Sequence, residues 1–248
     1  MPETMLKITD LHAGYGKIQI LSGVNLEAEP DRITAVLGGN GTGKSTLLKA
    51  ISGLIKPWQG TIEFDGERID GMRPDKIVRM GLSQVTQGKE VYPAMSVEEN
   101  IRVGAFVHTD RRKIAEDFER VYAYFPVLKE HRKSHAGTLS GGQLQMLCIG
   151  RGLMARPRMV MLDEPSSALA PRVILDIFHT LDKIRRDGTT ILLVEQNVRM
   201  GLLLAHYGYV IKDGVVHMKG EAESLMKDDN VRLSYLGGTL ASADGVTL

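Results

Sequence analysis

The stretch ITAVLGGNGTGKST, which occupies residues 33–46, decides the fold of this chain. Its first five residues are a continuous apolar run, the pattern of a strand buried on both faces of a parallel sheet. The remainder has the spacing G-x-x-x-x-G-K-S of a phosphate-binding P-loop, and residues 45–51 continue as a predicted helix. Strand, glycine loop and helix in this order are the context that such a loop requires, so the stretch predicts an α/β nucleotide-binding core.

The P-loop predicts its own contacts with a nucleoside triphosphate and a metal ion. Glycines let backbone N–H groups approach phosphate oxygens without obstruction, and the following helix adds the positive end of its dipole. Lys44 is predicted to reach the β- and γ-phosphates of ATP, and the hydroxyl of Ser45 to ligate Mg²⁺. The predicted nucleotide-binding residues of this segment are Gly38, Gly39, Asn40, Gly41, Thr42, Gly43, Lys44, Ser45 and Thr46.

Two acids end another apolar strand, which is predicted at residues 159–162. In P-loop enzymes the strand beside the loop delivers such an acid to Mg²⁺, so Asp163 is the predicted metal partner. Glu164 follows it and is placed to accept a proton from an attacking water, which makes it the predicted catalytic base. The alternative is a pair of solvated acids at a strand end, which is the weaker interpretation beside a matching P-loop.

A second glycine-bearing stretch, LSGGQ at residues 139–143, precedes a predicted helix that runs to Ala155. Ser140 is its predicted N-cap, and the hydroxyl and backbone donors of this turn suit an anion. One chain cannot easily fold both glycine stretches around the same nucleotide, whereas two chains facing each other can. We therefore expect an ATPase that closes as a dimer, in which Ser140, Gly141, Gly142 and Gln143 contact the nucleotide of the other chain.

The rest of the chain alternates strands with helices, which predicts a mostly parallel sheet with helices on its faces. We expect a single domain over residues 1–248, with a core at 1–90 and 158–248 and a helical subdomain at 91–157. Further predicted elements are strands at 6–10, 18–26, 61–64 and 190–194, helices at 111–125 and 171–186, a capping box at Ser96 and Glu99, and a hairpin of 209–212 with 215–218. Residues beyond Gly237 are predicted to fray.

Composition bounds the function. The 248 residues carry a formal net charge of +1, which gives no reason to expect a general nucleic-acid binder. The single cysteine, Cys148, cannot form an internal disulfide, fits a reducing cytosol and is predicted to be a small core residue. No apolar run approaches the length of a membrane span, and the first residues lack a secretory pattern.

Taken together, the P-loop, the LSGGQ stretch and the acidic strand end resemble the nucleotide-binding subunit of an ABC transporter over essentially the whole chain. The resemblance implies a P-loop core, an N-terminal antiparallel β subdomain, an inserted helical subdomain and head-to-tail dimers. It also implies that Tyr15 stacks on adenine and that Gln87 senses Mg²⁺ and the lytic water, with Gln84 as a rival at the wrong offset. Ala170 stands where the family usually has an aspartate that contacts the partner subunit.

Gln196 is a further departure, because most ABC ATPases have at this position a histidine that contacts the γ-phosphate. A glutamine can donate a hydrogen bond there but cannot take up a proton, which implies slower hydrolysis or more reliance on the companion subunit. This change resembles one branch of the family, the second ATPase of branched-chain amino acid importers. The stretches DEPS at 163–166, LAP at 169–171, LVEQNV at 193–198 and YLGG at 235–238 point to the same branch.

The resemblance implies partners and a location. The partners would be a second ABC ATPase, identical or different, two integral membrane permeases and, indirectly, a solute-binding protein, with no nucleic acid. The chain would be cytoplasmic and peripheral on the inner face of the cell membrane. Alternatives are a urea or amide importer, a non-transport ABC ATPase, which would usually add a coiled coil, zinc module or second cassette, and an unrelated P-loop kinase or GTPase.

Overall fold

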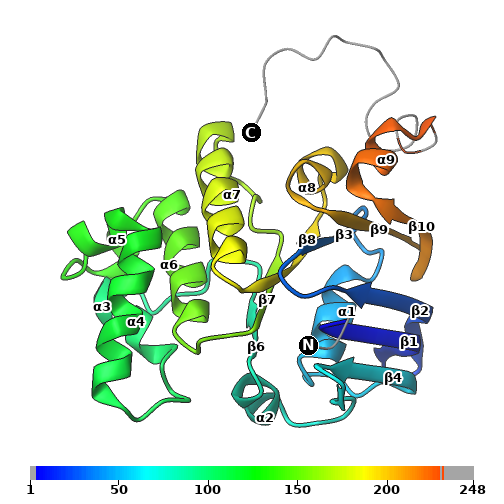
Figure 1. Cartoon of the computed structure of the whole chain (residues 1–248), viewed down its shortest axis with the longest axis horizontal. Coiled ribbons are helices and arrows are strands. Elements are labelled where there is room, and N and C mark those ends of the chain that lie inside the picture. Colours follow the sequence, from blue (N-terminus) through cyan, green and yellow to red (C-terminus); the bar gives the residue numbers. More distant parts are fainter. Residues whose placement is uncertain (1–3, 230, 232–248) are drawn as a thin grey trace.

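A six-stranded, mostly parallel sheet carries the P-loop strand in its interior (Figure 1). The computed structural model describes residues 4–229 and residue 231. The strands of this sheet are β3 (Ile33–Leu37), β6 (Leu82–Val85), β7 (Met159–Asp163), β8 (Thr190–Glu195), β9 (Tyr207–Lys212) and β10 (Val215–Glu221), in the spatial order β10-β9-β3-β8-β7-β6. All neighbours are parallel except β9 and β10, so the predicted α/β class is confirmed.

A second, antiparallel sheet lies against the helix that follows the P-loop (Figure 1). Its order is β2-β1-β4-β5, with β1 at Leu6–Tyr15, β2 at Ile18–Ala28, β4 at Gln59–Phe64 and β5 at Glu67–Arg68. Helix α1 (Lys44–Ile51) buries Leu47 and Leu48 in one apolar cluster with side chains of both sheets. Burial of such side chains stabilises the arrangement by about 1.5–3 kcal/mol each, which fixes the start of α1 between the sheets.

The first two strands are longer than the sequence predicts. The predicted strand at 6–10 continues through Gly14 to Tyr15 as β1, which pairs with β2 up to Ile18. A Cβ atom on Gly14 would lie only 2.0 Å from the carbonyl oxygen of Ile18, so the glycine permits a close strand pairing here. The turn that joins β1 to β2 follows Tyr15.

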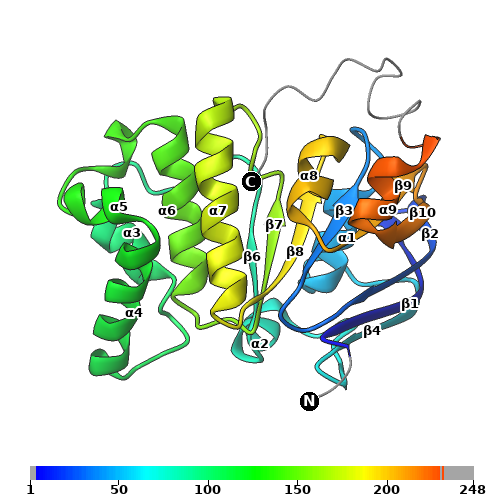
Figure 2. The same ribbon diagram turned by 45° about the horizontal axis from the view of Figure 1, so that its top comes forward.

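Four helices stand together beside the sheet, and α7 lies between them and the strands (Figure 2). They are α3 (Val97–Val103), α4 (Arg111–Tyr124), α5 (Pro126–Glu130) and α6 (Gly141–Leu153), while α7 spans Pro171–Arg186. The predicted capping box of Ser96 and Glu99 opens α3. Pro126 ends the α4 segment as predicted and also begins α5, because proline suits the first turn of a helix. Cys148 is buried in the core of this group, as expected, and burial raises the pKa of its thiol.

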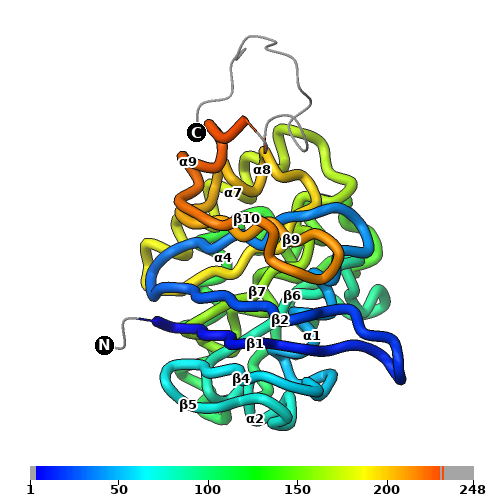
Figure 3. The backbone as a smooth tube through the Cα atoms, turned by 90° about the vertical axis from the view of Figure 1, so that its right-hand side faces the viewer, coloured from blue at the N-terminus to red at the C-terminus, as the bar shows by residue number. Residues whose placement is uncertain are grey.

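The predicted hairpin is confirmed and it braces the P-loop. Asp213 and Gly214 have φ angles of 49° and 76°, the paired left-handed conformation that a tight hairpin turn requires. Gly214 accepts a hydrogen bond from the N–H of Ser22 and donates one to the carbonyl of Thr42 in the P-loop. Figure 3 shows β9 and β10 lying above β2, β1 and β4.

The remaining elements are short. Among the described residues, the sequence analysis did not predict α5 or four further elements: α2 (Pro74–Arg79), α8 (Val198–Leu204), α9 (Ala222–Lys227) and the 3₁₀ turn Ala136–Thr138. The expected fraying beyond Gly237 and the YLGG stretch at 235–238 lie outside the described residues. In the described part of the chain, no helix has the length and apolarity needed to span a membrane.

Candidate nucleotide-binding site

The P-loop joins the carboxyl end of β3 to α1 and needs its glycines for space and for backbone conformation. A Cβ atom on Gly38 would lie 2.4 Å from the carbonyl oxygen of Ile211. Gly41 and Gly43 have φ angles of 76° and 105°, which side chains other than glycine rarely tolerate. Residues 39–41 are exposed at the tip of the loop, where their backbone groups are open to a ligand.

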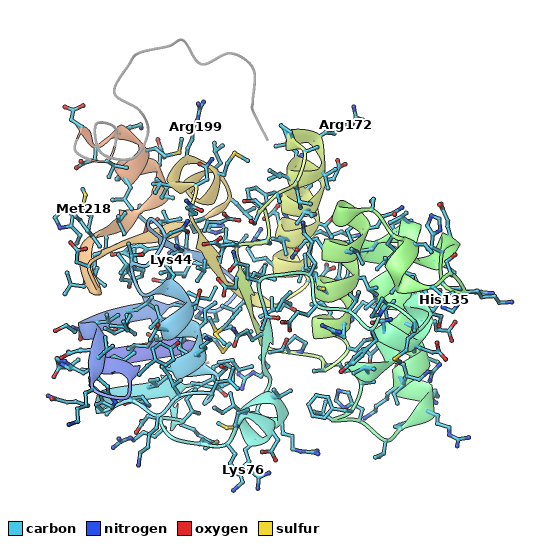
Figure 4. The ribbon with its side chains drawn as sticks, turned by 180° about the vertical axis from the view of Figure 1, so that it is seen from behind. Lys44, Lys76, His135, Arg172, Arg199 and Met218 are labelled. Atoms are coloured by element: carbon cyan, nitrogen blue, oxygen red, sulfur yellow. The ribbon has the colours of Figure 1, made fainter. Side chains whose placement is uncertain are left out.

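Lys44 lies beneath the loop with only 4% of its surface exposed. Its ammonium group donates to the carbonyls of Gly38 and Gly39, both at 2.9 Å, and lies 3.3 Å from Oε1 of Glu164. Figure 4 shows Lys44 well inside the molecule, whereas Lys76 and Arg172 extend from its edge. A buried ammonium group held in this way is a fixed positive charge directed at the loop.

Asp163 ends β7 with 7% of its surface exposed. Burial raises the pKa of its carboxyl group, a hydrogen bond with the Ser45 side chain lowers it, and the charge of Glu164 raises it. Among the described residues, nothing donates a hydrogen bond to its buried Oδ1. A buried carboxylate oxygen without a donor, beside a serine hydroxyl, is a donor set that suits a hard cation such as Mg²⁺.

Glu164 is held by two side chains from different parts of the chain. Gln87 donates from Nε2 to Oε2 of Glu164 at 2.8 Å, and Lys44 faces the other carboxylate oxygen. Gln87 follows β6, whereas the rival Gln84 lies within β6 and lines a separate cavity. Of the two glutamines, only Gln87 therefore reaches Glu164 in the described structure. Glu164 itself has a φ of 48°, in the left-handed region that non-glycine residues rarely adopt.

The strand order corrects one expectation and reveals a residue that sequence reasoning missed. The acidic strand β7 was expected beside the P-loop strand, but β8 lies between them, because β8 pairs with β3 on one side and β7 on the other. Strand β8 ends in Glu195, a carboxylate with 1% of its surface exposed. Its oxygens accept bonds from the Ser166 N–H at 3.0 Å and the Ser166 hydroxyl at 2.8 Å. The sequence did contain a signal for this residue, because Glu195 is an acid that directly follows the apolar run at 191–194.

Burial is the main cause of a large shift in the pKa of Glu195. It raises the pKa of the carboxyl group to about 7, the bonds from Ser166 oppose the shift, and the charge of Glu164 adds to it. Because an unfolded glutamate ionises near its ordinary value, the folded chain holds a proton that the unfolded chain has lost between about pH 4.5 and 7. The contribution of Glu195 to the free energy of unfolding therefore falls as pH rises through this window.

The variant E195Q is expected to gain stability over the wild type as pH rises. The gain should be small near pH 5 and reach about 2–3 kcal/mol near pH 8, since each unit of pKa shift is about 1.4 kcal/mol. Urea unfolding of the nucleotide-free proteins at both pH values measures it. An equal difference in the free energy of unfolding at both pH values would contradict the raised pKa of Glu195.

Gln196 follows Glu195 and is exposed. It lines a cavity of about 590 Å³ together with Gly39, Glu164 and Ser166. Gln196, just after the end of β8, thus shares this cavity with Glu164, which follows the neighbouring strand β7. Asn197 next to it caps α8 by accepting from the N–H of Met200.

Tyr15 and Ala170 occupy the edges of the site. Tyr15 is 44% exposed at the end of β1, and the ammonium of Lys49 in α1 lies 5.6 Å from its ring centroid. An open aromatic face near the P-loop helix can stack on a flat base. Ala170 is the N-cap of α7 and offers no side-chain capping bond.

The LSGGQ stretch forms a cluster of its own. Ser140 caps α6 in a reciprocal capping box with Gln143, which confirms the predicted N-cap. Within the described residues, no hydrogen bond joins positions 140–143 to the P-loop, and α7 with β7 and β8 lies between α6 and α1 in Figures 1 and 2. One chain therefore presents two separate glycine-bearing turns. Lys89 reaches from the Gln87 loop to the carbonyl of Ser167 at 3.1 Å, near the start of α6.

Comparison with known proteins decides the family. The ABC transporter family model matches residues 21–167, more than half of the chain. The chain belongs to the ABC transporter family. This ABC protein is 40% identical over 234 residues to the high-affinity branched-chain amino acid transport ATP-binding protein BraG of Pseudomonas aeruginosa. The aligned region covers 94% of this chain and 100% of BraG.

Two further comparisons extend this likeness. BraF, also a branched-chain amino acid transport ATP-binding protein of Pseudomonas aeruginosa, is 30% identical over 253 residues, with 96% of this chain and 99% of BraF covered. The crystal structure of MJ1267, an ATP-binding cassette of an ABC transporter in its ADP conformation, matches with a TM-score of 0.84 at 26% identity, covering 94% of this chain and 99% of that one. The ABC protein is accordingly an ATPase, and the family predicted from its three motifs is confirmed.

Proposed function

We propose that this ABC ATPase is the motor subunit of an importer for branched-chain amino acids. The observation that carries the proposal is the convergence of Lys44 and Gln87 on Glu164, beside a P-loop, in a chain 40% identical to BraG. Glu164 acts as the base that takes a proton from the attacking water. Lys44 and Gln87 hold its two oxygens in place, and Gln196 donates a hydrogen bond at the phosphate end of the same cavity.

Asp163 and Ser45 would hold Mg²⁺ in this mechanism. Their fit rests on the donor-free Oδ1 of Asp163 and on its hydrogen bond with the Ser45 side chain. When bound, the ion supplies charge neutralisation on the phosphates. Backbone donors of residues 38–43 bind the phosphates, and Tyr15 stacks on the adenine.

A second ATPase subunit completes the nucleotide site. The separation of residues 140–143 from the P-loop supports this step, because Ser140 and Gly141 are exposed at the start of α6. The greater identity to BraG than to BraF, which come from one organism, favours pairing with a different subunit. Each Ser140 turn then caps the triphosphate held by its neighbour.

The integral membrane permeases dock on a groove between β6 and the helices α3 and α6. This groove of about 190 Å³ has mostly apolar walls that include Val85 and Cys148, and Phe106 on its rim is 58% exposed. It extends to Thr86, the residue before Gln87, so motion of a docked segment would reach the base through the Gln87 side chain. This attachment places the chain on the inner face of the cell membrane.

Uptake by cells separates the cargo classes. In the source organism, replacement of the chromosomal copy by E164Q is expected to abolish uptake of radiolabelled leucine at micromolar concentration and to leave urea uptake unchanged. The matched control is E130Q, which removes an exposed carboxylate in α5 and should preserve both. Loss of urea uptake instead would favour the amide importer, and unchanged uptake of both would favour a role outside transport.

A further inference from the structure

We propose that Glu195 is a positioning residue for hydrolysis, which aims the Glu164 carboxylate by clamping Ser166. The inference rests on the proposed role of Glu164 as the base. Both oxygens of Glu195 are occupied by the same residue, one by the Ser166 N–H and one by its hydroxyl. The contact therefore fixes the position and orientation of the loop that begins at Glu164.

The clamp links that loop to the P-loop through one residue. The backbone carbonyl of Glu195 accepts the N–H of Gly38 at 3.4 Å, while its side chain holds Ser166. Strand β8 lies between β3 and β7, so its carboxyl end lies next to both loops. The P-loop and the loop that carries the base are thereby held in a fixed position relative to each other.

The loop needs such a clamp because its backbone is strained. Glu164 and Ala168 have φ angles of 48° and 55°, a conformation that costs about 1 kcal/mol or more for residues other than glycine. The turn is held by bonds from the Glu164 N–H to Val194 and from the Ser167 N–H to Glu164, together with the two bonds to Glu195. Without Glu195, the loop can relax and carry the base away from Lys44 and Gln87.

Packing alone does not explain a carboxyl group here. Burial beside the charge of Glu164 opposes ionisation of Glu195, and an apolar side chain of similar size would fill the same space without that cost. A leucine, however, cannot accept hydrogen bonds from Ser166. The retained function of the acid is therefore its pair of accepting oxygens.

Two substitutions separate this role from a merely structural one. E195L fills the space and removes both acceptors, whereas E195Q can accept from the Ser166 N–H and donate to its hydroxyl oxygen. We expect E195L to lower the kcat of ATP hydrolysis by about 10- to 100-fold, since an error of about 1 Å at a catalytic group has this order of effect. The dissociation constant for a fluorescent ATP analogue should stay within about threefold. E195Q should retain kcat within about threefold.

The matched control is D117L, which removes another fully buried acid, paired with Arg156 in the helical group. It should lower the melting temperature and leave kcat near the wild-type value. The proposal is overturned if E195L turns over like the wild type, if E195Q is as slow as E195L, if E195L loses nucleotide binding in parallel, or if D117L loses as much turnover. E164Q in the same assay tests the base itself: an active E164Q removes the proposed function of Glu164, whereas an active E195L with an inactive E164Q removes only the clamp.

Discussion

The variant E164Q is expected to bind Mg·ATP at least as tightly as the wild type and to lose turnover by about 10²- to 10⁴-fold, the range for removal of a positioned general base. Glutamine keeps the size of the side chain and can still accept the bond from Gln87. It cannot accept a proton from water. The loss therefore falls on kcat, and the nucleotide site keeps its shape.

Binding should be preserved for an electrostatic reason that the structure makes visible. Oε1 of Glu164 lies 3.3 Å from the ammonium of Lys44. The carboxylate therefore forms an ion pair with the cation that is predicted to face the phosphates. A negative charge here also repels a triphosphate. Removing it frees Lys44, and the affinity for ATP should stay level or rise by a few-fold.

Single-turnover hydrolysis and a fluorescent-nucleotide titration measure the two quantities separately. E130Q provides the control, because it removes an exposed carboxylate that lies on α5, in the helical group. Turnover by E164Q within tenfold of the wild type would remove Glu164 from the role of base. A large drop in affinity would instead assign it to binding.

The sheet core and its main motifs could be predicted because each depends on a local pattern. The glycines of the P-loop directly follow an apolar run, and the acids at 163–164 directly follow another. The structure places both pairs of features as expected. The Ser96 capping box and the Asp213 hairpin turn succeed for the same reason. Local chemistry specifies these features without knowledge of the rest of the chain.

Features that depend on the order of strands could not be predicted in this way. Nothing in residues 159–164 shows that β8 inserts between their strand and the P-loop strand, and Glu195 gains its role from that insertion. Strand β6 was missed because it is short, at Leu82–Val85, and is held by pairing with β7. The family pattern already favoured Gln87 over Gln84, but the contact of Gln87 with Glu164 could be seen only in the fold.

The variant K44A is expected to lose saturable nucleotide binding, with a fall in affinity of about 100-fold or more. Charge-assisted hydrogen bonds contribute about 1.5–3 kcal/mol each, and 1.4 kcal/mol is tenfold in affinity. Lys44 is the buried cation beneath the loop, and its ammonium is already fixed by the carbonyls of Gly38 and Gly39. Its loss leaves Glu164 facing the phosphates without the opposing charge.

A titration with a fluorescent ATP analogue checks this result, with K76A as the control for loss of one positive charge at a distant, exposed position (Figure 4). Saturable binding by K44A within threefold of the wild type would show that the backbone donors alone hold the triphosphate. The double variant K44A/E164Q is more informative still. If repulsion by Glu164 contributes to the K44A defect, removing that charge should restore part of the lost affinity, and the size of the recovery measures how strongly the two side chains are coupled.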